Sequence, residues 1–508
     1  MRNFLKFKNQ KSPSIEQWND KENFVKTEAP KTEILESEET QEAADFIDTL
    51  KSETLFASSK YTWKSKLLTM SNEEAEALRK RKNMAFEADI ATDTSLFDDM
   101  QEKRRIVKYV DDFIVNKYAS LKLEAFDNME KRLELRDILK SDAPRLTAFP
   151  NAVLDEILEE SVGLGVIERI ARNKTISEIN YNGTELIVES NDQKEVNQTG
   201  GYVDGDYIQR LIIGFASTIG KDFNESHPII DLVFKNFRVS GVHKIVANGT
   251  PTISIRVSQP GIMVTEAIIE QMSNSVIANL MAGLVLAKCN IVVCGETGSG
   301  KTEMTKRLLS YIPFNEKICL IEDVFEMHAK EIFPDADVES WVVTENADAS
   351  ELLSTAMRHD PTWVAVTELR KGKEANQWHQ ALRSDHSSIT SLHAASALMI
   401  PNRVMGMIGE VRNIQEERTE DEIKSLLNIG IHIKFRWIEG HKRRWIADIV
   451  EFRSKAEGDS IVIFEQDMDA KGKTTSKMQP ISKDLYKRLA SSGFNLSKYD
   501  QLISNYEK

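Results

Sequence analysis

The sequence contains few cysteines and no long hydrophobic run. Cys289, Cys294 and Cys319 are the only cysteines among its 508 residues, and their spacing is not that of metal ligands. This excludes a disulfide framework and a cysteine zinc site, and it is typical of a reducing compartment. No stretch reaches the roughly 18 apolar residues that span a bilayer. The opening "MRNFLKFKNQ" has no apolar segment after its basic residues, so we expect no secretory signal.

Positive charge is also in the minority. The formal net charge is −14, which argues against a protein whose main role is to coat nucleic acid. Hydrophobic residues make up 41% of the chain, enough for most of it to bury a core. The length predicts two or three domains.

Composition and periodicity divide the chain into four regions. Residues 1–104 are polar and acidic and predict a largely disordered extension, although 71–90 is typical of a charged, solvated helix. Apolar residues recur at helical spacing over 105–145, which indicates a segment of a small helical bundle. Residues 146–259 mix helix and strand patterns, with a hairpin expected around Asn182-Gly183, and predict an α+β N-terminal domain.

Residues 260–508 alternate helices with short apolar runs, as a parallel α/β sheet does, and end in a C-terminal extension. The candidate strands are "NIVVCG", "KICLIE", "TWVAVTE", "SITSLH" and "IHIKFRW". The predicted fold class is therefore α/β, with a helical and disordered extension and an α+β domain before it.

The segment "GETGSGKT" at 295–302 fits the phosphate-loop pattern G-x-x-x-x-G-K-[ST] at every position. A strand pattern precedes it and a helix pattern follows, which is the context that the motif requires. Backbone N–H groups of such a loop bind phosphate. We expect Lys301 to reach the β- and γ-phosphates and Thr302 to bind Mg²⁺. No N-K-x-D motif follows, which favours ATP over GTP. The expected nucleotide-binding residues are Gly295, Glu296, Thr297, Gly298, Ser299, Gly300, Lys301 and Thr302.

Several polar side chains stand at the ends of predicted strands. Glu322 and Asp323 follow "KICLI", and Glu368 follows "WVAVT". In an open α/β sheet the ligand binds at the carboxyl ends of the strands, so these carboxylates could position water or hold Mg²⁺. His393 ends "SSITSLH" and could contact the γ-phosphate. A surface carboxylate or a structural histidine is the alternative reading of each.

These motifs resemble the type II/type IV secretion ATPase superfamily, particularly the CpaF-like ATPases of Tad pili and conjugation-type secretion ATPases. The resemblance covers about 150–460. "LIEDVFEM" resembles the family's Asp box, "MRHDPTWVAVTELRKGKEA" its Walker B region, and "SDHSSITSLHA" its His box. "SHPIIDLVFKNFRVSGVH" resembles a segment of its N-terminal domain.

The resemblance implies a RecA-like motor domain with ATP between it and the N-terminal domain. It gives Glu368 the role of polarising water, places Glu322 and Asp323 in the Asp box, and makes His393 the His-box histidine. Arg238 and Arg256 lie where the family supplies arginines to the phosphates, a role that suits a permanent planar charge; a surface ion pair is the alternative. Asp323 joins Thr302 as an expected Mg²⁺ ligand.

The resemblance further implies a homo-hexamer in the cytoplasm, recruited to the inner face of the cell membrane by an integral membrane component of a secretion or pilus machine. Contact with DNA is not indicated. The expected function is ATP hydrolysis that powers secretion, pilus assembly or conjugative transfer.

The sequence departs from the family beside the site. The glycines usually found before the Walker B glutamate and after the next arginine are Thr367 and Lys371, and the usual Thr-Gly-His reads Ser384-Asp385-His386. These departures leave a second reading open, a nucleotide-gated scaffold with little hydrolysis. A DNA-translocating P-loop motor is a third, disfavoured by the acidic composition.

Overall fold

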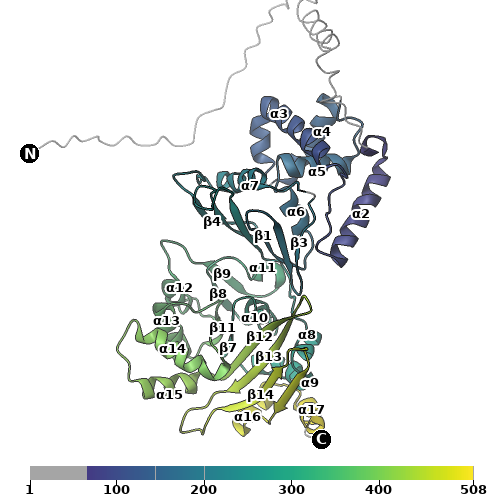
Figure 1. Ribbon diagram of the computed structural model, residues 1–508. Helices are drawn as coiled ribbons and strands as arrows, with labels where there is room; N and C mark the ends of the chain where they lie inside the picture. Colours follow the sequence, from purple (N-terminus) through teal and green to yellow (C-terminus); the bar gives the residue numbers. More distant parts are fainter. Residues whose placement is uncertain (1–65, 127, 144, 200, 507–508) are drawn as a thin grey trace, which may run out of the picture. The chain divides into compact units, whose positions relative to one another are not determined.

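The structure, a computed structural model, describes residues 66–126, 128–143, 145–199 and 201–506 (Figure 1). Most of the extension predicted over 1–104 therefore lies outside the described residues. Within the described ranges, no helix is both long and apolar enough to cross a membrane.

The first described elements are helical. They are η2 (Lys66–Thr69), α2 (Asn72–Ala88), α3 (Met100–Glu124), α4 (Met129–Asp142), α5 (Asn151–Ser161) and α6 (Val166–Ala171). A capping box between Ser71 and Glu74 starts α2, and Asp99 caps α3. The helix predicted over 71–90 is thus present, but it is not wholly solvated, because Ala75 and Phe86 are buried. Residues 66–104 are folded here rather than disordered.

The second part is a six-stranded antiparallel sheet, here called the N-terminal sheet. Its strands are β1 (Ile176–Tyr181), β2 (Leu186–Ser190), β3 (Lys194–Val196), β4 (Ile229–Phe234), β5 (Phe237–Val242) and β6 (Thr252–Val257), in the order β3-β2-β1-β6-β5-β4. Helix α7 (Gly205–Thr218) packs on β4 and β6. The hairpin expected around Asn182-Gly183 is confirmed as β1–β2. Arg238 on β5 lies directly opposite Arg256 on β6.

The third part is a nine-stranded sheet, here called the P-loop sheet. Its strands are β7 (Ile291–Gly295), β8 (Ile318–Glu322), β9 (Val338–Val342), β10 (Trp363–Val366), β11 (Ser387–Leu392), β12 (Ile429–Ile438), β13 (His441–Glu451), β14 (Ile461–Met468) and β15 (Thr474–Met478). The order is β15-β14-β13-β12-β7-β11-β10-β8-β9. Strands β12 to β9 in that order pair in parallel, and β13, β14 and β15 extend the sheet antiparallel.

Helices cover both faces of the P-loop sheet (Figure 1). On β7, Ile291 and Val293 join one buried cluster and Val292 and Cys294 join another, because successive strand side chains point to opposite faces. The first cluster includes residues of α8 (Glu266–Met272), α9 (Ser275–Leu286), α10 (Lys301–Leu309), α11 (Ala329–Ile332), α16 (Lys483–Ser491) and α17 (Leu496–Tyr506). The second includes residues of α12 (Ala349–Ala356), α13 (Gly372–Arg383), η3 (Ala397–Met399), α14 (Ile400–Gly409) and α15 (Glu416–Leu426).

The predicted α/β class is confirmed, and all five predicted parallel strands are present. Strand β9 was missed. Its residues "VESWV" include Glu339 and Ser340, so the sequence has no continuous apolar run there. This suits an edge strand whose residues are all half-buried.

Candidate functional site

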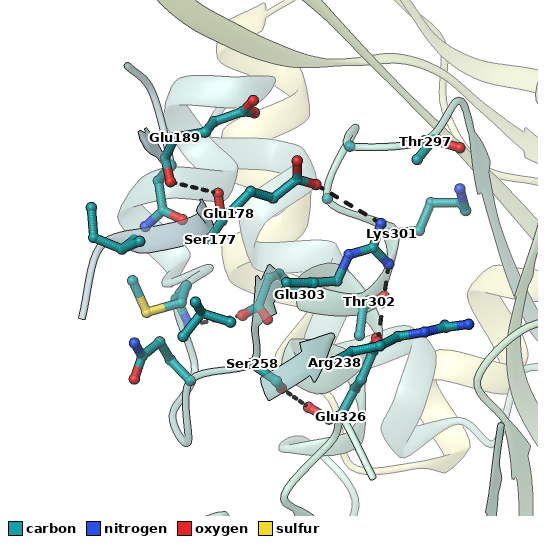
Figure 2. Close-up of a pocket in the computed structure, with 18 of the residues that line it drawn as sticks. Ser177, Glu178, Glu189, Arg238, Ser258, Thr297, Lys301, Thr302, Glu303 and Glu326 are labelled. Atoms are coloured by element: carbon teal, nitrogen blue, oxygen red, sulfur yellow. Dashed lines mark hydrogen bonds and ion pairs between the residues drawn. The ribbon is translucent and has the colours of Figure 1, made fainter. Parts of the chain in front are cut away.

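A cavity of about 500 Å³ is lined by residues of both sheets (Figure 2). The P-loop sheet contributes the phosphate loop, the ends of β10 and β11, and the start of β13. The N-terminal sheet contributes side chains of β1, β2, β5 and β6.

The phosphate loop runs from the end of β7 to the start of α10, as its motif requires. Gly295, Gly298 and Gly300 have φ values of 152°, 80° and 97°, a range that favours glycine. A Cβ at Gly295 would lie 2.3 Å from the Ile433 carbonyl oxygen, so no larger residue fits there. The loop is thus a backbone cradle before a helix N-terminus, which suits a phosphate chain.

Lys301 sits within this cradle. Its Nζ donates to the carbonyl oxygens of Gly295 at 3.0 Å and Glu296 at 3.2 Å. Burial lowers the pKa of Lys301, and the nearby Glu368 carboxylate opposes that shift. Of the predicted loop residues, Thr297, Gly298, Gly300, Lys301 and Thr302 line the cavity. Gly295, Glu296 and Ser299 do not.

Glu368 follows β10 and is held at both carboxylate oxygens. Its Oε1 lies 2.9 Å from His393 Nε2, and its Oε2 accepts from Arg370 at 3.0 Å. Burial alone would raise the pKa of Glu368, but the hydrogen bond and charge of Arg370, together with Lys301 and His393, hold it below the usual value. The carboxylate is therefore charged at neutral pH. The structure brings Glu368, His393 and Lys301 to one cavity.

The two predicted Asp-box residues lie outside the lining. Glu322 is 1% exposed and accepts hydrogen bonds from Ser340 Oγ at 2.8 Å and from the Met327 backbone at 2.9 Å. Burial raises the pKa of Glu322. This carboxylate holds the turn after β8. Asp323 pairs with Arg370 at 2.5 Å instead of lining the cavity.

The acidic residue of this turn that does line the cavity is Glu326. Glu326 belongs to the segment "LIEDVFEM" that resembles the Asp box, but it lies in the turn beyond the strand end and was not among the predicted site residues. Its backbone carbonyl accepts from Ser258 Oγ at 2.9 Å, which joins the turn to the end of the N-terminal sheet (Figure 2).

Arg238 and Arg256 both line the cavity from the N-terminal sheet. Arg238 lies 3.8 Å from Asp231, and Arg256 lies 3.9 Å from Glu178 and 4.0 Å from Glu326. These pairs are long and partly exposed, so they are weak. Both guanidinium groups remain able to bind an anion in the cavity.

Five cationic residues of the lining were not predicted: Lys174, Lys306, Arg370, Lys442 and Arg444. Arg370 follows Glu368 in the sequence and could have been found from its place in the Walker B region. Lys442 and Arg444 alternate along "HKRRW" at the start of β13, which puts both on one face of the strand. Only the pairing of β13 with β12 brings that face to the phosphate loop.

A nucleotide fits this donor set better than a resident metal ion does. Among the described residues, no group of three or more histidine, cysteine or acidic side chains could hold a metal. The cradle glycines and the cations Lys301, Arg238 and Arg256 fit a phosphate chain. The described residues thus define a P-loop nucleotide-binding α/β protein.

The family follows from comparison with known proteins. Residues 229–425 match the family model described as type II/IV secretion system protein. The chain is 35% identical over 407 residues to an uncharacterized protein of Bacillus anthracis, pXO2-25, covering 77% of this chain and 91% of that protein. The chain belongs to the type II/IV secretion ATPase superfamily.

Named relatives match over a shorter stretch. Type IV secretion system protein VirB11 of Bartonella quintana is 30% identical over 33% of this chain and 48% of that protein. Type IV secretion system protein PtlH of Bordetella pertussis is 35% identical over 31% of this chain and 49% of that protein. The chain thus spans about half the length of each of these two relatives.

Among solved structures, the VirB11 ATPase of Brucella suis is 24% identical with a TM-score of 0.31, covering 55% of this chain and 89% of that one. The Legionella pneumophila ATPase DotB is 17% identical with a TM-score of 0.43, covering 57% and 81%.

Proposed function

We propose that this protein is a cytoplasmic ATPase that powers a membrane-associated secretion, pilus-assembly or conjugative transfer machine as a homo-hexamer recruited by an integral membrane partner. One observation supports the proposal that the protein hydrolyses ATP. Glu368, ionised at neutral pH, shares a cavity with the phosphate-loop Lys301 and with Arg238 and Arg256 of the other sheet. Membership of the family supports the proposed hexamer, the membrane partner and the role in secretion, pilus assembly or conjugative transfer.

The residues that line the cavity have different roles in the proposed hydrolysis. The loop N–H groups and Lys301 hold the β- and γ-phosphates, and Arg238 and Arg256 neutralise charge that develops on the γ-phosphate oxygens. Glu368 accepts a hydrogen bond from the attacking water and orients its oxygen toward the γ-phosphorus. The new P–O bond forms as the bond between the γ-phosphorus and the bridging β-phosphate oxygen breaks, and the protons of the water leave with the phosphate, giving ADP and dihydrogen phosphate. Bound Mg²⁺, held through Thr302, would supply further charge neutralisation at the phosphates.

His393 and Arg370 connect the carboxylate to the bound nucleotide. Both cavity-lining groups contact Glu368. A γ-phosphate would compete for these donors because it carries more negative charge than a carboxylate. We propose that this competition frees one oxygen of Glu368 for water, so that the carboxylate acts only when a triphosphate is present.

The test is steady-state release of phosphate from Mg²⁺-ATP by the native chain and by Glu368→Gln, with particle mass followed in the same samples. We expect turnover in a hexameric fraction and a loss of at least about 100-fold in the variant. Glu345→Gln, at an exposed glutamate outside the cavity lining, is the matched control and should keep the native rate.

The departures at Thr367 and Lys371 favour one alternative, a nucleotide-gated scaffold with little hydrolysis. A glycine does stand one residue after Lys371, and no larger residue fits there, since a Cβ at Gly372 would lie 2.4 Å from the Met407 carbonyl oxygen. If the native hexamer binds ATP but shows no turnover that depends on Glu368, the scaffold replaces the motor.

A further inference from the structure

The start of β13 bridges the phosphate loop and the N-terminal sheet. Its residues His441, Lys442 and Arg444 are here called the β13 bridge. The backbone N–H of Lys442 donates to the Asp192 carbonyl at 2.5 Å, and His441 pairs with Gln193 as an isolated antiparallel bridge. A strand of one sheet thus docks by its backbone on the turn between β2 and β3 of the other.

The side chain of Lys442 strengthens this contact. Its Nζ lies 2.6 Å from Glu189 Oε1, and the two side chains are 6% and 9% exposed. The same ammonium group lies 4.6 Å from the ring centre of Phe435 on β12. Removing Glu189 would leave the buried charge of Lys442 without an acidic partner among the described residues, whereas Glu189 also lies 3.4 Å from Lys194.

Arg444 contacts both the N-terminal sheet and the phosphate loop. One guanidinium nitrogen donates to the Asn191 carbonyl of the β2–β3 turn, and the other donates to the Gly298 carbonyl of the phosphate loop at 3.3 Å. A Cβ built at Gly300 would lie 3.6 Å from Arg444 Nε, so this nitrogen lies against the loop. The Nε–H is buried, and among the described residues it has no hydrogen-bond partner.

Both cationic side chains also line the cavity. An orphaned guanidinium donor beside a phosphate-binding loop needs an acceptor, since a buried donor without one costs roughly 1–3 kcal/mol. An oxygen of a bound nucleotide phosphate would supply it.

We propose that Arg444 is a nucleotide-binding residue and that, together with Lys442, it couples occupancy of the phosphate loop to the β2–β3 turn of the N-terminal sheet. This rests on the proposed function only in taking the ligand to be a nucleotide. When a phosphate draws the Arg444 guanidinium toward the loop, its hydrogen bond to Asn191 changes, and the Lys442–Glu189 pair carries the change to β2. Arg444 is the contact to the ligand, and Lys442 and Glu189 are positioning residues.

Binding of the non-hydrolysable analogue AMP-PNP tests the first half. We expect Arg444→Met to weaken affinity about tenfold in calorimetry, and Arg444→Lys to fall between, since it keeps the charge but loses the planar fork. Arg443→Met is the matched control, because Arg443 is the exposed neighbour on the opposite face of β13 and should bind as the native chain does. Equal affinity of Arg444→Met and Arg443→Met would overturn the assignment.

Hydrogen exchange of residues 186–196 tests the coupling. We expect AMP-PNP to change exchange there in the native chain and in Arg443→Met, and to change it little in Glu189→Gln. An AMP-PNP response in Glu189→Gln as large as the native one would overturn the coupling. Turnover enters neither readout, so a chain that binds AMP-PNP without hydrolysing ATP would fail as a motor while leaving this proposal intact. A native chain that does not bind AMP-PNP would contradict both.

Discussion

At the level of single residues, Asp385 shows how a departure from the family pattern affects the backbone energy of a turn. It stands between α13 and β11, where the Thr-Gly-His pattern of the resemblance has glycine, and its φ is 65°. Glycine adopts this left-handed conformation freely, and aspartate tolerates it better than most residues do. The change from glycine therefore alters the backbone cost of the turn and not the set of groups in the cavity.

We predict that Asp385→Val lowers the free energy of unfolding by about 1–2 kcal/mol, because a β-branched residue resists positive φ. Asp385→Gly should stay within about 0.5 kcal/mol of native, since relief at the turn is offset by greater freedom of the unfolded chain. Urea unfolding midpoints would measure both.

Ser384→Val is the matched control, because Ser384 is the preceding exposed residue and has a φ of −97°. If valine were equally costly at both positions, the backbone explanation would be wrong. Glycine at 385 should also leave ATP turnover unchanged. A large gain in turnover would show that this departure does impair the site.

At the element scale, a buried ion cluster joins the helices before the N-terminal sheet. Lys103 of α3 is fully buried, and its Nζ lies 2.8 Å from Glu156 and 2.9 Å from Glu160 of α5. Arg169 of α6 lies 2.6 Å from the same Glu160 oxygen. Burial alone would raise the pKa of both glutamates, but Lys103 and Arg169 outweigh it and lower each to about 2.

We predict that Lys103→Met destabilises the fold by about 3–5 kcal/mol, because two buried carboxylates lose their shared partner. Lys108→Met, at an exposed lysine of the same helix, is the control and should change stability by less than about 0.5 kcal/mol. Urea unfolding at pH 7 measures the difference. A small effect of Lys103→Met would mean that water or a rearranged Arg169 replaces the ammonium group.

The same cluster predicts the acid response. Because the folded pKa of each glutamate lies below its ordinary value of 4.5, each contributes stability that is fully present above pH 4.5 and is lost as pH falls toward 2. Lys103→Met should raise those folded pKa values, so its stability should fall less steeply with acid. Urea midpoints measured from pH 7 to 3 would show it.

Much at this scale could be predicted from the sequence. Runs such as "NIVVCG" and "KICLIE" identified the parallel strands, and Asn182-Gly183 identified the β1–β2 hairpin. The packing of helices against one another could not be predicted, because it depends on contacts between residues far apart in the sequence. The packed face of α2 needs α5 against it, since Arg79 bonds Glu159 across 80 positions.

At the scale of the whole molecule, the cavity exists because two sheets meet. The phosphate loop, Glu368 and His393 could be predicted from motif and strand ends, because the carboxyl ends of parallel strands lie at one edge. Glu322 illustrates the limit: it is at a strand end as expected, yet its carboxylate turns to Ser340 and the turn backbone. Lys442 and Arg444 reach the site only through pairing of β13 with β12, which no local pattern indicates.

Glu368 of this two-sheet cavity is proposed to serve hydrolysis and not nucleotide binding. The most direct measurement is the identity of the nucleotide bound after incubation with Mg²⁺-ATP, read by acid quench and chromatography. The native chain should hold mainly ADP, and Glu368→Gln should hold a similar total amount, mainly as ATP. If Glu368→Gln converts bound ATP to ADP as fast as the native chain, Glu368 does not position the attacking water and the proposed mechanism is wrong.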